Sequence, residues 1–411
     1  MTRNWAGTHD YAAAHIIPAA SEAEVRRVVV STSGPVHALG TRHSFTDLPD
    51  TTGILLDLSA LSGNFTLGDG TVCVAAGTRY GVLATWLDEQ ELALHNLGSL
   101  PHISVAGATA TGTHGSGNGN GVLTSAVRSM RFITFDGEVR EVRRGEADFA
   151  ALAVGVGAFG VIVSLELETQ RSYRMRQDIY TGVSWDAALG AFDDLTGAGY
   201  SVSVFTRWLG ESIGAVWVKT RLATDGAPVA GALLDGVLDP QAAPLGELAD
   251  VTEIGGVPGP WMLRLPHFRL DGTPSFGDEI QSEYFVARDD APAALAAVRE
   301  LGPLIEPLLF VSELRTMSAD ELWLSPAYGR DSLAIHFTWR NEPRAVREVL
   351  PKIEAALAPF DARPHWGKLH DFTRADIERV HPRVADARAV FERCDPEGRF
   401  VNDHLARVGV R

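Results

Sequence analysis

The chain has 411 residues, more than one hydrophobic core usually organises, and 45% of them are hydrophobic, so we expect a globular protein of two domains. Its formal net charge of -16 argues against nucleic acid and anionic membrane surfaces as partners, because both are bound through clustered Lys and Arg. The two cysteines lie far apart and outside any Cys-x-x-Cys or Cys/His motif, so we expect no metal site. The start of the chain has no apolar core of signal-peptide length, and no later apolar run is long enough to span a membrane, so we expect a cytoplasmic protein.

The first 170 residues alternate short helices and strands. In "SEAEVRRVVVS", Ser21 and Glu24 have the spacing of a capping box and open a helical pattern, and "PVHALG" at residues 35–40 is typical of a buried strand. We also predict a helix at 79–90, a hairpin over 131–142 that turns at Asp136 and Gly137, and strands at 53–61, 71–77 and 157–170.

Between about 175 and 370 the pattern changes to alternating polar and apolar residues. Strands are predicted at 200–208, 214–222, 281–288, 310–317 and 333–339, and helices at 291–301 and 343–360. Residues 225–260 are rich in Pro, Gly and Ala and are predicted to be loops. This texture indicates a second, antiparallel domain and an α+β fold.

Two glycine-bearing turns in the first domain each precede a histidine, "LGTRHSF" at 39–45 and "GTHGSGNGNG" at 112–121. Glycine lets the backbone approach a ligand, and the second run could hold a diphosphate through its N–H groups. It is neither a Rossmann fingerprint nor a Walker A loop. An isolated run of this kind fits a surface loop equally well, but two such turns in one domain favour one bound ligand.

Stretches along nearly the whole chain resemble the bacterial alditol oxidases of the vanillyl-alcohol oxidase flavoprotein superfamily. They include "LGTRHSF", "NLGSLPHISVAGATATGTHGSG", "GVGAFGVIVSLEL", "GVPGPWMLRLPHFR", "QSEYF", "SELRT", "HFTW", "RPHWGK" and "DPEGRFVND". The resemblance implies an FAD-binding α+β domain at 1–175, a substrate domain built on an antiparallel sheet at 176–372, and a C-terminal segment at 373–411 that returns to the FAD domain.

The resemblance also implies FAD bound covalently through His43. A neutral imidazole is a competent nucleophile near pH 7, so a turn can present it to the flavin edge. His114 is expected to shape the phosphate loop or contact FAD, without being a second tether. The implied cofactor residues are Gly40, Thr41, Arg42, His43, Ser44, Phe45, Ser104, Gly107, Gly112, Thr113, His114, Gly115, Ser116, Val161 and Asn402.

Arg42 departs from the family, whose members commonly carry Gly-Ser-Gly-His-Ser-Phe in this turn. If the position needs a positive φ, a residue other than glycine is strained by roughly 1 kcal/mol or more. The side chain either pairs with an FAD phosphate or points to solvent.

The second domain is expected to place a substrate site over the flavin. The period of a strand puts Glu313 and Arg315 on one face, and likewise His336 and Thr338. From the residues alone, an ordinary salt bridge for Glu313 with Arg315 and a core histidine at His336 are the favoured explanations. The resemblance instead implies a polyol site made of Ser104, Gln281, Glu313, Arg315, His336, Thr338 and Lys368.

The resemblance implies oxidation of the C1 hydroxyl of an alditol such as xylitol or sorbitol to an aldose, with oxygen reduced to hydrogen peroxide. Catalysis is assigned to Lys368, Arg315, Glu313 and His336. Arg315 and Lys368 would stabilise the developing alkoxide, while the proton acceptor is Lys368, His336 or a water bound to Glu313. Two alternatives are an aldonolactone oxidoreductase and a flavin-binding protein without turnover. We expect a monomer whose partners are a small polyol and oxygen.

Overall fold

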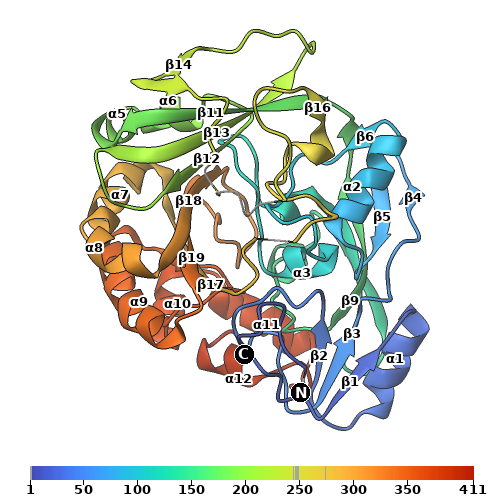
Figure 1. Cartoon of the computed structure of the whole chain (residues 1–411). Helices are drawn as coiled ribbons and strands as arrows, with labels where there is room; N and C mark the ends of the chain where they lie inside the picture. The colour runs from blue at the N-terminus through green and yellow to red at the C-terminus, as the bar shows by residue number, and fades with distance from the viewer. Residues whose placement is uncertain (1, 244, 246–249, 274) are drawn as a thin grey trace.

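The N-terminal part of the chain forms two sheets, seen at the right of Figure 1. The computed structural model describes residues 2–243, 245, 250–273 and 275–411. Three parallel strands are ordered β1 (His15–Pro18), β3 (Ile54–Asp57) and β2 (Val36–Leu39). An antiparallel sheet is ordered β4 (Thr66–Leu67), β5 (Thr71–Ala75), β9 (Val161–Glu168), β7 (Val127–Ile133) and β8 (Val139–Arg143). The helices here are α1 (Glu22–Ser31), α2 (Tyr80–Glu89), α3 (Val105–Ala110) and α4 (Phe149–Leu152), and β6 (Leu92–Ala93) pairs with β10 (Gln170–Arg171).

Local signals explain several of these elements. At the start of α1, Ser21 Oγ accepts a hydrogen bond from the Glu24 backbone N–H at 3.3 Å, and the Glu24 carboxylate accepts one from the Ala20 N–H at 2.7 Å. The hairpin between β7 and β8 closes where Gly137 adopts a φ of 80° and donates to the Thr134 carbonyl. The predicted helix start and hairpin turn are confirmed.

A large antiparallel sheet forms the other side of the molecule. Its order is β14 (Ala232–Leu233), β15 (Gly236–Leu238), β11 (Arg174–Ser184), β13 (Ser212–Leu222), β12 (Ser201–Thr206), β18 (Leu309–Met317), β19 (Ser332–Arg340), β17 (Glu279–Ala287) and β20 (Arg363–Pro364), with β16 (Gly259–Pro260) paired to β11. The expected α+β fold with a large antiparallel sheet in the second part of the chain is confirmed.

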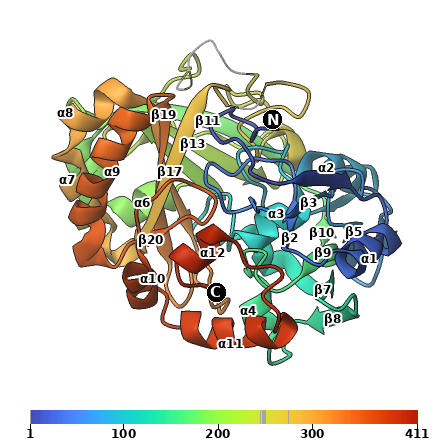
Figure 2. The same cartoon turned by 90° about the horizontal axis from the view of Figure 1, so that it is seen from below.

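Helices cover the outer face of this sheet (Figures 1 and 2). They are α5 (Trp185–Gly190), α6 (Phe192–Thr196), α7 (Ala291–Arg299), α8 (Gly302–Ile305) and α9 (Pro343–Leu357). On β19, Ile335, Phe337 and Trp339 belong to the hydrophobic core on the helix side. The alternate residues His336 and Thr338 therefore face the opposite side, toward the N-terminal part.

The C-terminal segment packs against the N-terminal sheets, as Figure 2 shows for α11 and α12. It contains α10 (Arg374–Val380), α11 (Val384–Cys394) and α12 (Asp403–Arg407). Asn402 caps α12 through the Leu405 N–H and donates to the carbonyls of Leu48 and Asp50 at 2.7 and 2.8 Å. Arg399 donates to carbonyls of residues 29, 32 and 135. The domain limits at 175 and 372 stay a prediction.

The prediction of loops over 225–260 is wrong in part, because β14, β15 and β16 lie in this stretch. These strands are only two or three residues long and are held by pairing with neighbouring strands, so no period was available in the sequence. Five short 3-10 helices complete the described residues: Leu123–Ala126, Trp261–Leu263, Arg288–Asp290, Glu306–Leu308 and Ala358–Phe360. No helix within the described ranges is both long and apolar enough to cross a bilayer.

Candidate active site

A large cavity lies between the large sheet and the N-terminal part. Its empty space, including solvent at the mouth, is about 1750 Å³. One wall comes from the turn at residues 40–45, from α3 and from the segment around Gly157. The other wall comes from β17, β18 and β19 and from the loop that carries Lys368. The cavity thus joins the two glycine-bearing turns to the strands that carry the predicted polar pairs.

Strand register brings the polar residues of the second wall into one row. Glu313 on β18 lies opposite His336 on β19, which in turn lies opposite Glu283 on β17. One step along, Gln281 lies opposite Thr338. Side chains directly opposite each other on antiparallel strands lie about 5 Å apart at their Cβ atoms, so the register alone concentrates these groups.

Glu283 is the centre of this row and is fully buried. Its carboxylate accepts hydrogen bonds from Arg315 Nη2 at 2.7 Å and from Lys368 Nζ at 2.8 Å. His114 Nε2 lies 3.3 Å from the same carboxylate. Burial alone would raise the pKa of Glu283, but the positive charges of Lys368 and Arg315 hold it well below its usual value. The site therefore contains a fixed carboxylate anion.

Lys368 connects this anion to a histidine. Its ammonium group donates to His336 Nδ1 at 2.8 Å, and His336 Nε2 lies 3.0 Å from Thr338 Oγ1. Burial, reinforced by the charge of Lys368, holds the pKa of His336 well below its usual value, so the ring is neutral. With Nδ1 accepting, the ring proton is on Nε2 and is donated to Thr338. Burial also lowers the pKa of Lys368, against the opposing effect of Glu283.

A second buried chain ends at Glu313. His267 Nε2 lies 2.6 Å from Glu313 Oε1, and Lys219 Nζ lies 3.1 Å from His267 Nδ1. Burial lowers the pKa of His267 to about 4 and that of Lys219 to about 7. Burial would raise the pKa of Glu313, but Arg315 and His267 hold it low. One carboxylate oxygen of Glu313 is thereby occupied, while the residue still lines the cavity.

Arg315 links the two walls. Its guanidinium donates to Glu283 on β17 and to Ser99 Oγ, at 3.1 Å, on the N-terminal side. Burial would lower the pKa of Arg315, but Glu313 and Glu283 raise it, so the cation persists. A cation held on two sides in this way is oriented before any ligand enters.

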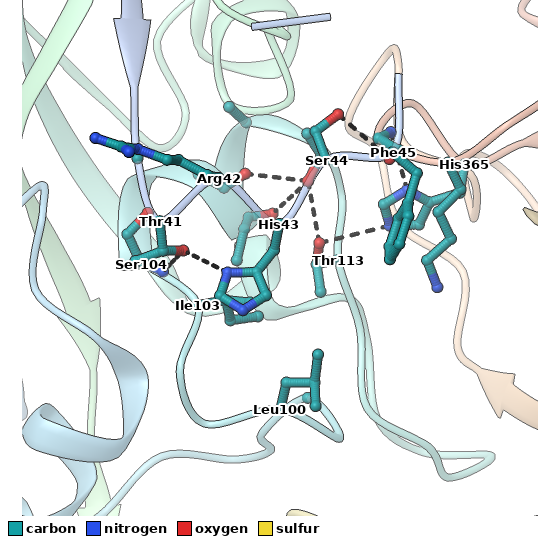
Figure 3. Close-up of a pocket in the computed structure, with 18 of the residues that line it drawn as sticks. Thr41, Arg42, His43, Ser44, Phe45, Leu100, Ile103, Ser104, Thr113 and His365 are labelled. Carbon is teal, nitrogen blue, oxygen red and sulfur yellow. Dashed lines mark hydrogen bonds between the residues drawn. The ribbon is translucent and has the colours of Figure 1, made fainter. Parts of the chain in front are cut away.

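The turn at residues 40–45 presents His43 to the cavity. Figure 3 shows its ring extending toward Leu100 and Ile103. His43 Nδ1 lies 3.1 Å from Thr41 Oγ1, and the ring stacks on Trp5 at 5.1 Å between centroids. Burial lowers the pKa of His43 to about 4, so the imidazole is neutral at pH 7. Its Nε2 has no hydrogen-bond partner in the part of the chain that the structure describes.

Arg42 adopts a φ of 65°, which answers the question that its departure from glycine raised. Its side chain forms an ion pair with Asp57, at 2.7 Å between Nη2 and Oδ2. Burial would raise the pKa of Asp57, but hydrogen bonding to Ser59 and the Arg42 guanidinium lower it. Arg42 thus adopts a left-handed backbone conformation, and its side chain binds the carboxylate of Asp57.

The lining of the N-terminal wall fits an FAD. Glycines at positions 40, 77, 98, 107, 157 and 160 line it, so little side-chain bulk separates a ligand from the backbone. His37 also lines the cavity, is 4% exposed, and neither of its ring nitrogens has a partner among the described residues. Together with His43 Nε2, it leaves polar atoms on this wall that a dinucleotide can satisfy.

The structure brings most of the predicted site residues to this cavity. Lining it are Gly40, Thr41, Arg42, His43, Ser44, Phe45, Ser104, Gly107, Thr113, His114, Gln281, Glu313, Arg315, His336, Thr338 and Lys368. Five predicted cofactor residues are not among its lining residues: Gly112, Gly115, Ser116, Val161 and Asn402.

These five residues have structural surroundings of their own. Gly112 has a φ of 64° and approaches Pro326, and Gly115 packs against Asn96. Ser116 donates to the Val202 carbonyl. Val161, the first residue of β9, belongs to the core, whereas its neighbours Gly160 and Ile162 line the cavity, and Asn402 caps α12. Adjacent residues on a strand or a tight turn point in different directions, so a matching motif does not place every member at the ligand.

Sequence reasoning missed Glu283, His267, Lys219, Ser99 and His365. Glu283 is two residues after Gln281 in "QSEYF", so the period of β17 could have assigned it to the same face. His365 lies two residues before Gly367 and contacts Thr113 Oγ1 at 3.5 Å. The roles of His267 and Lys219 had no sequence signal, because only the fold brings them to Glu313.

Comparison with known proteins identifies relatives over the whole chain. Residues 13–143 match the FAD binding domain family, and residues 278–408 match the D-arabinono-1,4-lactone oxidase family. The chain is 39% identical to alditol oxidase from Streptomyces sp. (strain IKD472) over 98% of its own length and 97% of the relative's. It is 28% identical to L-gulono-1,4-lactone dehydrogenase from Mycobacterium tuberculosis, over 98% of each chain. The structure of cholesterol oxidase from B. sterolicum aligns with a TM-score of 0.78 over 99% of this chain and 96% of that one, at 15% identity, which shows the shared fold.

Proposed function

Because the chain belongs to the flavoprotein family of the Streptomyces alditol oxidase, we propose that it oxidises the C1 hydroxyl of an alditol such as xylitol or sorbitol to an aldose. Oxygen is the electron acceptor and becomes hydrogen peroxide. The observation that carries this proposal is the row of Glu283, His336 and Glu313 across three strands, bound by Lys368 and Arg315, on the cavity wall opposite His43.

The polar wall suits a polyol. A polyol presents a row of hydroxyl groups that each donate and accept a hydrogen bond, and the wall offers both kinds of partner. Glu313 accepts, Arg315 and Lys368 donate, and Gln281 and Thr338 do either, as does Ser104 on the opposite wall. The buried anions and cations balance one another, so a neutral substrate enters without leaving a charge unpaired.

Bound FAD supplies the acceptor for the hydride that leaves C1, and passes the electrons to oxygen. The protein handles the hydroxyl proton and the charge that develops on oxygen. Arg315 and Lys368 stabilise the alkoxide, since both are cations with little exposure to solvent. Lys368 gives one of its protons to the neutral His336 Nδ1, 2.8 Å away, and the lone pair that this frees on Nζ takes the proton of the alcohol. His336 is therefore the proposed proton acceptor.

We assign His43 as the covalent tether of the flavin. Its ring is neutral, faces the cavity and has a free nitrogen with no partner among the described residues. Acid precipitation of the purified protein with trichloroacetic acid is expected to leave yellow flavin in the pellet, and His43→Ala is expected to release it to the supernatant. The variant should still bind FAD, because the remaining cavity wall is intact. Flavin found wholly in the supernatant of the unmutated protein would exclude the tether.

A second candidate is oxidation of an aldonolactone, which the match of residues 278–408 to a lactone oxidase family supports. Steady-state hydrogen peroxide production separates the two candidates and also a protein without turnover. With a panel of xylitol, sorbitol, mannitol, glycerol and L-gulono-1,4-lactone, we expect peroxide from alditols. Peroxide from the lactone alone, or bleaching of the flavin by the lactone in the absence of air without peroxide, supports the second candidate. Neither peroxide nor bleaching with any substrate supports a flavin-binding protein without turnover.

A further inference from the structure

The turn at residues 40–45, which carries the proposed tether His43, contains one residue other than glycine with a positive φ, Arg42. With a φ of 65°, it lies in the left-handed region that glycine adopts readily and other L-residues avoid. The next residue in the chain is His43. A rotation of the Arg42 backbone back to a negative φ would therefore turn the imidazole away from its place in the cavity.

The ion pair between Arg42 and Asp57 counteracts this tendency. Asp57 is the last residue of β3, and the parallel register places it beside Leu39, the last residue of β2, from which the turn departs. Asp57 Oδ2 accepts from Arg42 Nη2 at 2.7 Å, while Oδ1 accepts from the Ser59 N–H at 3.0 Å. The carboxylate is thus fixed at a strand end, and its side chain is 14% exposed.

The backbone of Arg42 is tied to His43 a second way. The Arg42 carbonyl accepts from the Trp5 N–H at 2.8 Å, and the Trp5 ring stacks on His43. A second cavity is lined by Trp5, Thr41, Arg42, His43 and Asp57 among others, so the turn has room to relax if the ion pair is lost. Figure 3 shows the Arg42 side chain running away from the His43 ring, which leaves the ring free to face the cavity.

We propose that Asp57 is a positioning residue for flavin attachment: its ion pair holds Arg42 in the left-handed conformation that aims His43 at the cofactor. The inference rests on the proposed tether. Attachment joins a His43 ring nitrogen to the 8α-carbon of the flavin, with one hydrogen lost from each; oxygen takes the two protons and two electrons and yields hydrogen peroxide. Asp57 takes no part in that chemistry and acts only through the turn.

The test follows covalent incorporation of FAD into full-length protein produced under riboflavin limitation. Samples are precipitated with trichloroacetic acid at successive times, and flavin fluorescence of the pellet gives the rate. Asp57→Ala should slow incorporation by roughly tenfold, the factor that corresponds to the cost of a left-handed non-glycine residue. Its Kd for FAD, measured by flavin fluorescence before attachment, should stay within about twofold, because the cavity wall is unchanged.

The rescue variant gives the decisive comparison. In Asp57→Ala/Arg42→Gly, glycine adopts the same φ without support, so incorporation should return to near the unmutated rate. Asp225→Ala serves as the matched control, since it removes an ion pair with Arg174 of equal length, 2.7 Å, on β11. It should leave the rate unchanged.

Three outcomes overturn the inference. They are an unmutated rate in Asp57→Ala, a double variant as slow as Asp57→Ala, or an equal slowing in Asp225→Ala. If Asp57→Ala does not bind FAD at all, the double variant still tests the inference. A general role of Asp57 in folding would leave the double variant equally unable to bind FAD, whereas a role through Arg42 would restore binding and attachment. Absence of covalent flavin in the unmutated protein would refute the His43 tether itself. The unmutated sample alone therefore separates failure of the tether from failure of the inference about Asp57.

Discussion

Lys368 Nζ lies 2.8 Å from Glu283 Oε2, a contact between residues 85 positions apart whose carboxylate partner is fully buried. The pair explains how a lysine in a largely apolar cavity keeps a proton, since Glu283 opposes the effect of burial on its pKa. It also orients the ammonium group toward His336.

Removing one member of this pair should cost more than removing both. Glu283→Gln leaves buried cations without their anion, and we expect it to lower the free energy of unfolding by about 3 kcal/mol. Lys368→Met in the same chain should recover part of that loss. Urea unfolding of the two single variants and the double variant gives the coupling energy. Simple additivity of the three values would show that the pair contributes no interaction of its own. As a control, Asp225→Asn at the exposed pair with Arg174 should change the free energy by less than about 1 kcal/mol.

Lys368→Met should also impair the reaction more than it impairs binding. Lys368 donates to charge that develops only as the alcohol loses its proton, so its loss removes stabilisation of the transition state. We expect flavin reduction by xylitol to slow on the order of a hundredfold, with a smaller change in the substrate Kd. Stopped-flow absorbance measures both, and an unchanged flavin spectrum checks that the fold persists. A variant that reduces its flavin at close to the unmutated rate would leave Lys368 a polar wall residue.

His267→Phe should have the opposite profile. The ring is retained beside Phe205 and Trp217, while the hydrogen bond that fixes Glu313 at 2.6 Å is lost. Because His336 is the proposed proton acceptor, Glu313 is left to bind polyol hydroxyls, so KM for xylitol should rise by about tenfold while kcat falls less. Steady-state kinetics distinguishes this from a loss confined to kcat, which would place His267 in the chemical step.

Stability toward acid should depend on His381. Its side chain is 0% exposed, neither ring nitrogen has a partner among the described residues, and burial, reinforced by Arg363, holds its pKa well below the usual value. The unfolded chain therefore binds a proton below about pH 6.5 that the folded chain does not, and stability falls as the pH falls through that value. His381→Phe removes this proton uptake and keeps the contact with Trp366.

Urea unfolding at pH 7 and pH 5 tests this expectation. The loss of unfolding free energy between the two pH values should be smaller in His381→Phe by roughly 1–2 kcal/mol. Equal losses in both proteins would mean that the histidine is not buried in its neutral form.

Much of the fold could be predicted from period and turn chemistry. The strands with long alternating patterns, such as β18 and β19, were found with errors of one or two residues, and Glu313 with Arg315 share a face as their spacing indicates. The eleven-residue β11 was missed, and so were the two- and three-residue strands at the sheet edge. The short strands form because they pair with neighbouring strands of the sheet, and they contain too few residues to show a period of two in the sequence.

The site divides in the same way. Residues that belong to a recognisable motif, such as His43 in "LGTRHSF" or Lys368 in "RPHWGK", could be predicted from the sequence. The partners that set their charge could not, because Glu283, His267 and Asp57 come to them through sheet register and chain packing. Arg42 illustrates the difference best. The sequence shows an arginine where relatives commonly have glycine, but only the parallel pairing of β2 with β3 brings Asp57 close enough to form an ion pair with it.

The central claim, that this cavity oxidises an alditol on its flavin, is tested most directly by mixing the purified protein with xylitol in the absence of air in a stopped-flow instrument. We predict that the oxidised flavin absorbance bleaches in a single turnover, that air restores it with one hydrogen peroxide per flavin, and that an aldose appears. Bleaching by L-gulono-1,4-lactone with no response to any alditol, or a reduced flavin that air does not reoxidise, would contradict the claim.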